Sequence, residues 1–178
     1  LSATLGHAGT SAELAAVWQA ATDAPFAFTR FDSEFSLETG LVYFLGGRLA
    51  DSGTDGTIWS FDPVTGSYAN TGVTLPVPIS NYEIARLIDG NGDEVLVVFG
   101  GRTAAGTVTT TVQGYFPVAN TTTTFASDPY PLATSPGGVT VAGNKAYVFG
   151  GFDAVVALSA THIFDITAAA GARWTIGP

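Results

Sequence analysis

The sequence has no cysteine and no methionine, and only one of its 178 residues, Lys145, is a lysine. Without cysteine, the chain has no disulfide framework, no thiolate metal site and no cysteine nucleophile. Without methionine, it lacks an initiator residue, so we expect a processed protein or part of a longer product. Scarce lysine, abundant threonine, glycine and alanine, and an acidic balance favour an extracellular or cell-surface bacterial protein.

Positive charge is scarce throughout the chain. Six lysine and arginine residues stand against 15 aspartates and glutamates, which gives a net charge of −9. No basic stripe exists that could neutralise a phosphate backbone, so nucleic acid is not an expected partner, and anionic membrane surfaces are disfavoured for the same reason. No apolar run approaches the roughly 20 residues that a membrane-spanning helix needs, so we expect no transmembrane segment.

A short apolar strand followed by two glycines occurs three times. The copies are Val42–Gly47, Val97–Gly101 and Tyr147–Gly151, and their second glycines lie 54 and 50 residues apart. A repeat of this length, built from strands and turn residues, is typical of one small sheet per repeat arranged radially. The sequence therefore predicts an all-β fold made of propeller blades, each with four antiparallel strands.

The repeat divides the chain into three expected blades and a leading segment. The boundaries are residues 1–29 for the leading segment, 30–79 for blade 1, 80–134 for blade 2 and 135–178 for blade 3. Within the leading segment, Thr10 and Glu13 have capping-box spacing, which favours a short helix. By repeat position, Trp18 corresponds to Tyr68, which favours an outer strand of a preceding blade. Both interpretations stay open.

Turn residues and apolar stretches locate the strands within each blade. The expected strands of blade 1 are Phe31–Leu37, Leu41–Gly47, Ile58–Phe61 and Ser67–Thr71, with a loop at Arg48–Thr57. Those of blade 2 are Tyr82–Ile88, Val95–Gly101, a threonine-rich strand ending near Phe116, and a strand near Thr122–Ala126. Those of blade 3 are Gly138–Val141, Lys145–Gly151, His162–Asp165 and Arg173–Thr175.

The glycine pairs belong to a longer pattern. An aromatic-aspartate pair follows 13 to 15 residues later, at Phe61-Asp62 and Phe164-Asp165, and a further aromatic residue stands in the last strand at Tyr68 and Trp174. This pattern resembles the kelch repeat, over roughly residues 30 to 178. Blade 2 departs from it, because Tyr115-Phe116 lacks the aspartate and Phe125 replaces the tryptophan.

Three blades are fewer than a ring requires. Propellers close with about four to eight blades, and an open arc leaves apolar blade faces and strand edges exposed. Either the chain is a segment of a larger propeller, or a second copy or another protein completes the ring. We therefore expect further blades or a protein partner.

Candidate chemistry is sparse. Asp89, Asn91 and Asp93 alternate like the start of a calcium loop, but the pattern does not continue, and a solvated hairpin turn explains the same residues. Among kelch-like enzymes, the galactose oxidase family uses copper held by tyrosines and histidines with a crosslinked cysteine; this chain has no cysteine and only His7 and His162. No nucleophilic triad is evident. We expect no cofactor, and the sequence favours a non-enzymatic protein.

The kelch resemblance implies that the loops after each glycine pair and those entering each inner strand gather on one face near the axis. The candidate ligand-binding residues on that face are Arg30, Arg48, Tyr82, Arg102 and Asp153. Arg48 and Arg102 follow the glycine pairs directly and are suited to bind a carboxylate or a sugar acid. Alternatively, these arginines pair with acids such as Asp32, Asp51 or Glu83 and brace the loops.

Two functional hypotheses follow. The first is a non-enzymatic protein-interaction or assembly module of an extracellular or cell-surface propeller. The alternative is a carbohydrate-binding or carbohydrate-modifying propeller with a loop-lined pocket, similar to the sialic-acid mutarotases, whose ligand would be a glycan. A glycosylation sequon at Asn120-Thr121-Thr122 is expected to be unoccupied in a bacterial protein.

Overall fold

The computed structural model describes residues 21–177. Twelve strands form three four-stranded antiparallel sheets, each with its strands in sequence order, and no helix occurs among these residues. The helix-or-strand question around Thr10 and Trp18 lies outside the described residues. The strands are β1 (Ser33–Phe35), β2 (Val42–Arg48), β3 (Thr54–Asp62) and β4 (Ser67–Thr74) in blade 1; β5 (Glu83–Ile88), β6 (Glu94–Phe99), β7 (Val112–Phe116) and β8 (Thr121–Thr124) in blade 2; and β9 (Gly138–Ala142), β10 (Lys145–Phe152), β11 (Ala157–Asp165) and β12 (Trp174–Ile176) in blade 3.

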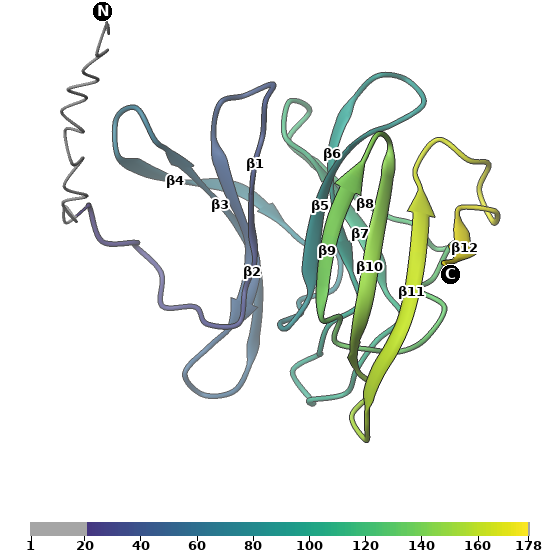
Figure 1. The fold of residues 1–178 in the computed structure, drawn as a ribbon. Coiled ribbons are helices and arrows are strands. Elements are labelled where there is room, and N and C mark those ends of the chain that lie inside the picture. Colours follow the sequence, from purple (N-terminus) through teal and green to yellow (C-terminus); the bar gives the residue numbers. More distant parts are fainter. Residues whose placement is uncertain (1–20, 178) are drawn as a thin grey trace, which may run out of the picture.

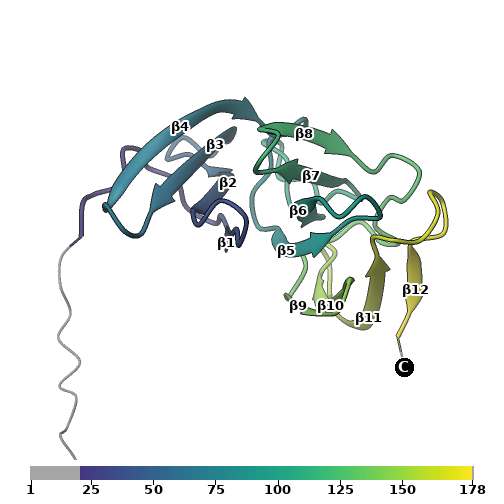
Figure 2. The same cartoon turned by 90° about the horizontal axis from the view of Figure 1, so that it is seen from above.

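The three sheets fan out as propeller blades (Figures 1 and 2). The first strands of the blades, β1, β5 and β9, lie next to one another on the inner side, where β5 contacts both neighbours. The last strands, β4, β8 and β12, lie outermost. The predicted all-β class and the four-stranded antiparallel blades are therefore confirmed.

Several strands differ in extent from those expected. β3 begins at Thr54, inside the expected loop Arg48–Thr57, and β11 begins at Ala157, five residues before His162. In both hairpins the pairing shifts register at the first glycine of the pair and then resumes, so a bulge extends the ladder beyond the glycines. β1 is shorter than expected, and β8 ends before Phe125.

The second glycine of each pair allows a close backbone approach. A Cβ atom added at Gly101 would lie 2.8 Å from the carbonyl oxygen of Ser80, and one at Gly151 would collide with that of Ser135. Both glycines also have positive φ angles, 103° and 119°. The loop entering each inner strand therefore packs against the backbone of the glycine pair, which a larger residue would prevent.

Alternation along the second strand of each blade decides which neighbour a side chain contacts. We call the side of a sheet that faces the next blade in the sequence its forward face, and the opposite side its backward face. Tyr43 and Leu45 on blade 1 face forward and pack against blade 2. Val97 and Phe99 on blade 2 face forward and pack against blade 3. Two apolar clusters, one at each interface, form the core.

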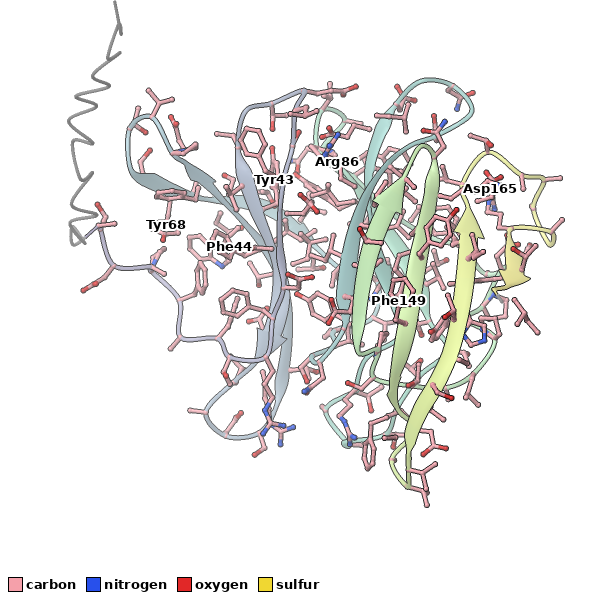
Figure 3. The ribbon with its side chains drawn as sticks, in the orientation of Figure 1. Tyr43, Phe44, Tyr68, Arg86, Phe149 and Asp165 are labelled. Atoms are coloured by element: carbon pink, nitrogen blue, oxygen red, sulfur yellow. The ribbon has the colours of Figure 1, made fainter. Side chains whose placement is uncertain are left out.

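The outer faces of the two end blades are unlike each other. On the forward face of blade 3, Phe149 is 45% exposed, although Phe99 at the same repeat position is fully buried. On the backward face of blade 1, Phe44 and Tyr68 point away from blade 2 (Figure 3). The ring of Phe26 lies over both of them, with centroid separations of 5.4 and 6.0 Å. Blade 1 is thus covered by its own preceding segment, and blade 3 is bare.

Within the described part of the chain, no helix is long and apolar enough to cross a membrane.

Candidate functional site

The candidate site lies at the end of the blades where the glycine pairs are found, the lower end in Figure 1. Each blade repeats one arrangement there. The residue after the glycine pair forms a β-bridge with the segment that leads into the inner strand. These bridges join Thr29 to Arg48, Ser80 to Arg102 and Ser135 to Phe152. The repeat therefore places equivalent loops of three blades side by side, as the kelch resemblance implied.

Hydrogen bonds connect these loops from blade to blade. The Asn81 N–H donates to the carbonyl oxygen of Arg30 at 2.8 Å, and the Ser135 hydroxyl donates to the carbonyl oxygen of Asn81 at 2.6 Å. Arg30 and Asn81 both have a φ of 55°, an unusual value for residues other than glycine. The shared conformation and the connecting bonds show that the loops are held in a defined arrangement.

The loops border an open pocket of about 240 Å³, which we call the mouth. Two of the residues predicted from the sequence, Arg30 and Tyr82, line it. The full lining is Arg30, Phe31, Asn81, Tyr82, Glu83, Ser135 and Pro136. The lining thus combines an arginine, a glutamate, an asparagine and a serine with two aromatic residues.

Tyr82 forms a fixed wall of the mouth. The side chain is 3% exposed, and its hydroxyl donates a hydrogen bond to the carbonyl oxygen of Leu45 in blade 1. Burial raises the pKa of the Tyr82 phenol far above its ordinary value, so the group stays protonated. Tyr82 therefore contributes shape and anchors blade 2 to blade 1, rather than acting as an acid or base.

Glu83, whose pKa is shifted, also lines the mouth, and it is not among the ligand-binding residues predicted from the sequence. It is half-buried, and burial together with the charge of Asp32 raises its pKa to about 7. Asp32 itself accepts hydrogen bonds from the backbone N–H groups of Ser33 at 2.7 Å and Ile84 at 3.0 Å. Near neutral pH, Glu83 can therefore gain or lose a proton.

A signal for Glu83 was present in the repeat. Arg30-Phe31-Asp32 and Asn81-Tyr82-Glu83 occupy equivalent positions, each with a polar residue, an aromatic residue and an acid. Aligning the loops that enter the inner strands would have placed an acid beside Tyr82. Its shifted pKa depends on burial between two blades, which the sequence does not show.

The other three predicted residues lie in neighbouring loops, outside the mouth. The Arg102 Nη1 donates to the carbonyl oxygen of Gly106 at 3.2 Å, and its guanidinium lies 5.4 Å from the centre of the Phe152 ring. Arg48 follows its glycine pair and pairs through its backbone with Thr29. The Asp153 carboxylate accepts hydrogen bonds from the N–H groups two and three residues further on, which lower its pKa.

The expected pairing of these arginines with acids is wrong for the described residues. The three ion pairs found between residues 21 and 177 use other cations: Arg86 with Glu94, Lys145 with Asp165, and Arg173 with Asp128. Arg102 braces its loop through a carbonyl group and an aromatic ring instead. The carboxylates of Asp51 and Asp153 accept hydrogen bonds from backbone N–H groups of their own turns.

The weak calcium candidate forms a hairpin turn. One carboxylate oxygen of Asp89 accepts hydrogen bonds from the N–H groups of Asn91 at 2.8 Å and Asp93 at 3.0 Å. Across residues 21–177, no group of three or more histidine, aspartate and glutamate side chains is arranged to hold a metal ion. His162 is 8% exposed and packs against Tyr130, and burial lowers its pKa, so it is a neutral packing residue.

The sequon residue Asn120 has a structural role. Its Nδ2 donates to the carbonyl oxygen of Thr71 in blade 1 at 3.0 Å, and its Oδ1 accepts from the Tyr115 hydroxyl at 2.9 Å. A glycan on Nδ2 would disrupt this contact between two blades.

Comparisons with known proteins bear on the fold. No protein-family model matches the chain, and no curated protein matches its sequence. Among solved structures, one described as "Structure of YjhT" matches with a TM-score of 0.72 and 15% sequence identity, covering 91% of this chain. The chain spans 55% of that structure. At this identity the likeness shows that the three blades have a β-propeller arrangement, and function has to be argued from the chain's own residues.

Proposed function

We propose that the chain is a non-enzymatic interaction and assembly module of a kelch-like propeller, and that it docks a further blade or a protein partner on the forward face of blade 3. The observation that carries the proposal is the exposure of Phe149. Its counterparts Leu45 and Phe99 are fully buried because the next blade covers them. By its repeat position, Phe149 therefore belongs to a surface that packs against a neighbouring blade, but no other blade covers it among the described residues.

The neighbours of Phe149 extend this face. Tyr147 lies two residues away on the same side of β10, and Ile163 is paired directly opposite it on β11. Thr161 stands opposite Phe149 itself. Aromatic, aliphatic and threonine side chains on one sheet face form the kind of surface that the two internal interfaces already bury.

The acidic, lysine-poor composition supports an extracellular or cell-surface setting for this module, because such proteins commonly combine few lysines with many threonines and glycines. We propose this location as part of the same function.

Sedimentation velocity across a concentration series tests the assembly role. Burying an exposed aromatic surface favours association, so the wild-type chain is expected to self-associate or to bind an apolar dye, and Phe149→Ser is expected to reduce both. Val64→Ser is the matched control, because Val64 is 91% exposed on a turn of blade 1. A monodisperse wild-type monomer that binds no dye would contradict the proposal.

The mouth supports a second candidate, the binding or modification of a carbohydrate. Arg30 suits the carboxylate of an acidic sugar, Asn81 and Ser135 suit hydroxyl groups, and the ring of Phe31 suits the apolar face of a sugar ring.

A glycan screen followed by calorimetry tests this second candidate. Arg30→Ala is expected to abolish binding of an acidic sugar, while Arg48→Ala, outside the mouth, is expected to retain it.

The raised pKa of Glu83 also predicts a pH dependence of stability. Because this pKa is about 7 in the folded protein, the contribution of Glu83 to the free energy of unfolding is present at low pH and is lost as the pH rises through 7. Glu83→Gln should therefore stabilise the fold above pH 7, by about 1 kcal/mol or less for a half-exposed group.

A further inference from the structure

The backward face of blade 1 presents aromatic side chains that are only half-buried. They lie on β2, β3 and β4, and they are Phe44, Trp59, Phe61 and Tyr68. Phe61 holds the repeat position of Tyr115 in blade 2 and Phe164 in blade 3, which are 1% and 0% exposed because a neighbouring blade covers them. Phe26 covers part of this face, but all four rings keep some exposure. The face therefore resembles those that blades 2 and 3 bury, without being buried itself.

The interface between blades 2 and 3 shows what two of these rings are suited to contact. The ring of Phe99, on the forward face of blade 2, lies 5.4 Å from that of Phe164 and 5.6 Å from that of Trp174. The latter two rings belong to the backward face of blade 3 and lie 5.0 Å apart. Their counterparts in blade 1, Phe61 and Tyr68, lie 4.8 Å apart. Blade 1 thus holds two rings of the same three-ring contact, already placed side by side.

Phe149 supplies the third ring. It holds the repeat position of Phe99 on the forward face of blade 3, where it is 45% exposed. Blades 1 and 3 lie at opposite ends of the arc, with blade 2 between them (Figure 2). The two faces therefore cannot meet within one chain, but they match as the two halves of one interface.

The segment that carries Phe26 leaves this contact open. Phe26 lies three residues before Thr29, and Val77 lies three residues before Ser80, which forms the equivalent β-bridge in blade 2. Val77 packs against the apolar cluster between blades 1 and 2. An apolar entry residue is thus an ordinary part of a closed interface, and Phe26 fills the same position when a further blade packs against blade 1.

A second copy of the chain suits these two faces better than an unrelated protein, for two reasons. It presents both complementary faces at once, so two identical head-to-tail junctions form, and such contacts give a ring when the rotation between copies closes. It also supplies the right amount of structure. The chain spans 55% of the solved structure described above, so about as much again completes an assembly of that size.

We propose that two copies of the chain close a ring of six blades, in which the forward face of blade 3 of each copy packs against the backward face of blade 1 of the other. Phe149 of one copy contacts Phe61 and Tyr68 of the other, as Phe99 contacts Phe164 and Trp174 within one chain. Propellers close with about four to eight blades, and six lies within that range. This pairing rests on the assembly role proposed above and makes a second copy the partner.

Ring closure also completes the mouth. Its lining comes from the entry loops of all three blades, including Arg30 from blade 1 and Ser135 from blade 3. In the ring, the entry loop of blade 1 in one copy follows that of blade 3 in the other. The loops of both copies therefore surround one axis, and any ligand there meets residues from two chains.

Sedimentation equilibrium and native mass spectrometry test the ring on the full chain. Sedimentation is measured at about 0.15 M salt, because each copy carries a net charge of −9 that low salt leaves unscreened. The wild-type chain is expected to form a dimer. The dimer is not expected to grow into larger species as the concentration rises, because both faces of each copy are then occupied.

Two variants test which faces meet. Phe149→Ser alters the forward face of blade 3. Tyr68→Thr alters the backward face of blade 1, and blade 2 already has a threonine, Thr122, at this repeat position, so the strand tolerates the change. Each variant alters both junctions of its own dimer and is expected to weaken dimer formation about tenfold or more. Val64→Ser, on an exposed turn of blade 1, is the matched control and should leave the dimer unchanged.

Mixing the two variants gives the decisive readout. A pair of one Phe149→Ser chain and one Tyr68→Thr chain keeps one unaltered junction, so the mixed dimer is expected to form more tightly than either variant dimerises alone. Labelling one variant with ¹⁵N separates mixed from uniform dimers by mass. The ring is overturned if the mixture associates no better than the single variants, if Tyr68→Thr dimerises like the wild type, or if the wild-type species keep growing with concentration.

The same measurements separate the ring from the assembly role on which it rests. A wild-type chain that stays monomeric but binds an apolar dye overturns the second copy as the partner and leaves the assembly role to a different protein or a further blade. A monomer that binds no dye contradicts both.

Discussion

Blades 1 and 2 are tied together by many hydrogen bonds from polar side chains, whereas blades 2 and 3 are held by a group of aromatic rings and a buried ion pair. Across the first interface, Ile84 N–H donates to the carboxylate of Asp32, and the hydroxyl of Thr122 donates to the carbonyl oxygen of Thr74. Across the second, the ring of Phe99 lies 5.4 Å from that of Phe164 and 5.6 Å from that of Trp174.

One repeat position shows this difference most clearly. Trp59, Gln113 and His162 stand opposite the same position of the preceding strand in the three blades. Gln113 is fully buried and bonds both the N–H and the carbonyl oxygen of Val77, at 3.0 and 2.9 Å. Trp59 and His162 instead pack against the rings of Phe26 and Tyr130. Each side chain holds the segment that leads into its blade.

The difference shows that the repeat determines where an interface between blades forms but not which interactions stabilise it. Positions that alternate toward a neighbouring blade must be buried, and several chemistries satisfy that requirement. We therefore expect the two interfaces to respond differently to loss of packing, to acid and to loss of hydrogen bonds.

The largest effect is expected at the aromatic interface. Phe164→Ala removes a fully buried ring that contacts Phe99, Phe125 and Trp174, and should lower the free energy of unfolding by about 3–5 kcal/mol. Chemical denaturation measures this loss. Phe149→Ala is the control, because its ring is on the bare face and should cost less than about 1 kcal/mol. Equal losses in the two variants would remove the distinction between a covered and a bare face.

A smaller, pH-dependent effect is expected at the ion pair. Asp128 is 3% exposed and lies 2.8 Å from the Arg173 guanidinium. Burial by itself would raise the pKa of Asp128, but hydrogen bonds from Arg173 and from the Gly171 N–H outweigh it and hold the pKa below its ordinary value. The contribution of Asp128 to stability is therefore present above about pH 4 and is lost as the pH falls through the lowered pKa.

Asp128→Asn should lower the free energy of unfolding by about 2–3 kcal/mol at pH 7, because it leaves the Arg173 charge without its partner. The loss should shrink toward zero in strong acid, where wild-type Asp128 is also neutral. Denaturant unfolding at a series of pH values measures it. A loss that is independent of pH would mean that shape, and not charge, sets the contribution of Asp128.

The smallest effect is expected at the polar interface. Gln113→Leu keeps the volume of the side chain but removes two hydrogen bonds to the backbone of Val77, and should cost about 1–2 kcal/mol. Because the entry segment of blade 2 loses its anchor, amide hydrogen exchange should accelerate at Val77 more than in β9 and β10. Uniform acceleration across all blades would show that this bond does not act locally.

Much of the blade pattern could be predicted from the sequence. The three glycine pairs, the alternation in Tyr43–Leu45 and the turn at Asp89–Asp93 depend on residues close together in the chain, and all appear in the structure. The early start of β3 could not be predicted, because a bulge at the glycine pair carries the ladder into a stretch rich in turn residues.

The site was predicted only in part, for a related reason. Repeat position placed Arg30 and Tyr82 at the end where the inner strands begin, and both line the mouth. Arg48 and Arg102 had the same kind of support, yet their side chains lie outside the mouth, since the hydrogen bonds between loops decide which side chains converge.

The sequence by itself determined the blade, because strand alternation, glycine conformation and turn chemistry act over a few residues. Only the tertiary structure decided the raised pKa of Glu83, the unpartnered oxygen of Glu94 and the exposure of Phe149. Each of these depends on whether a residue of another blade, about 50 positions away in the sequence, buries the group, places a charge beside it or forms a hydrogen bond with it. Such contacts arise when the blades pack together.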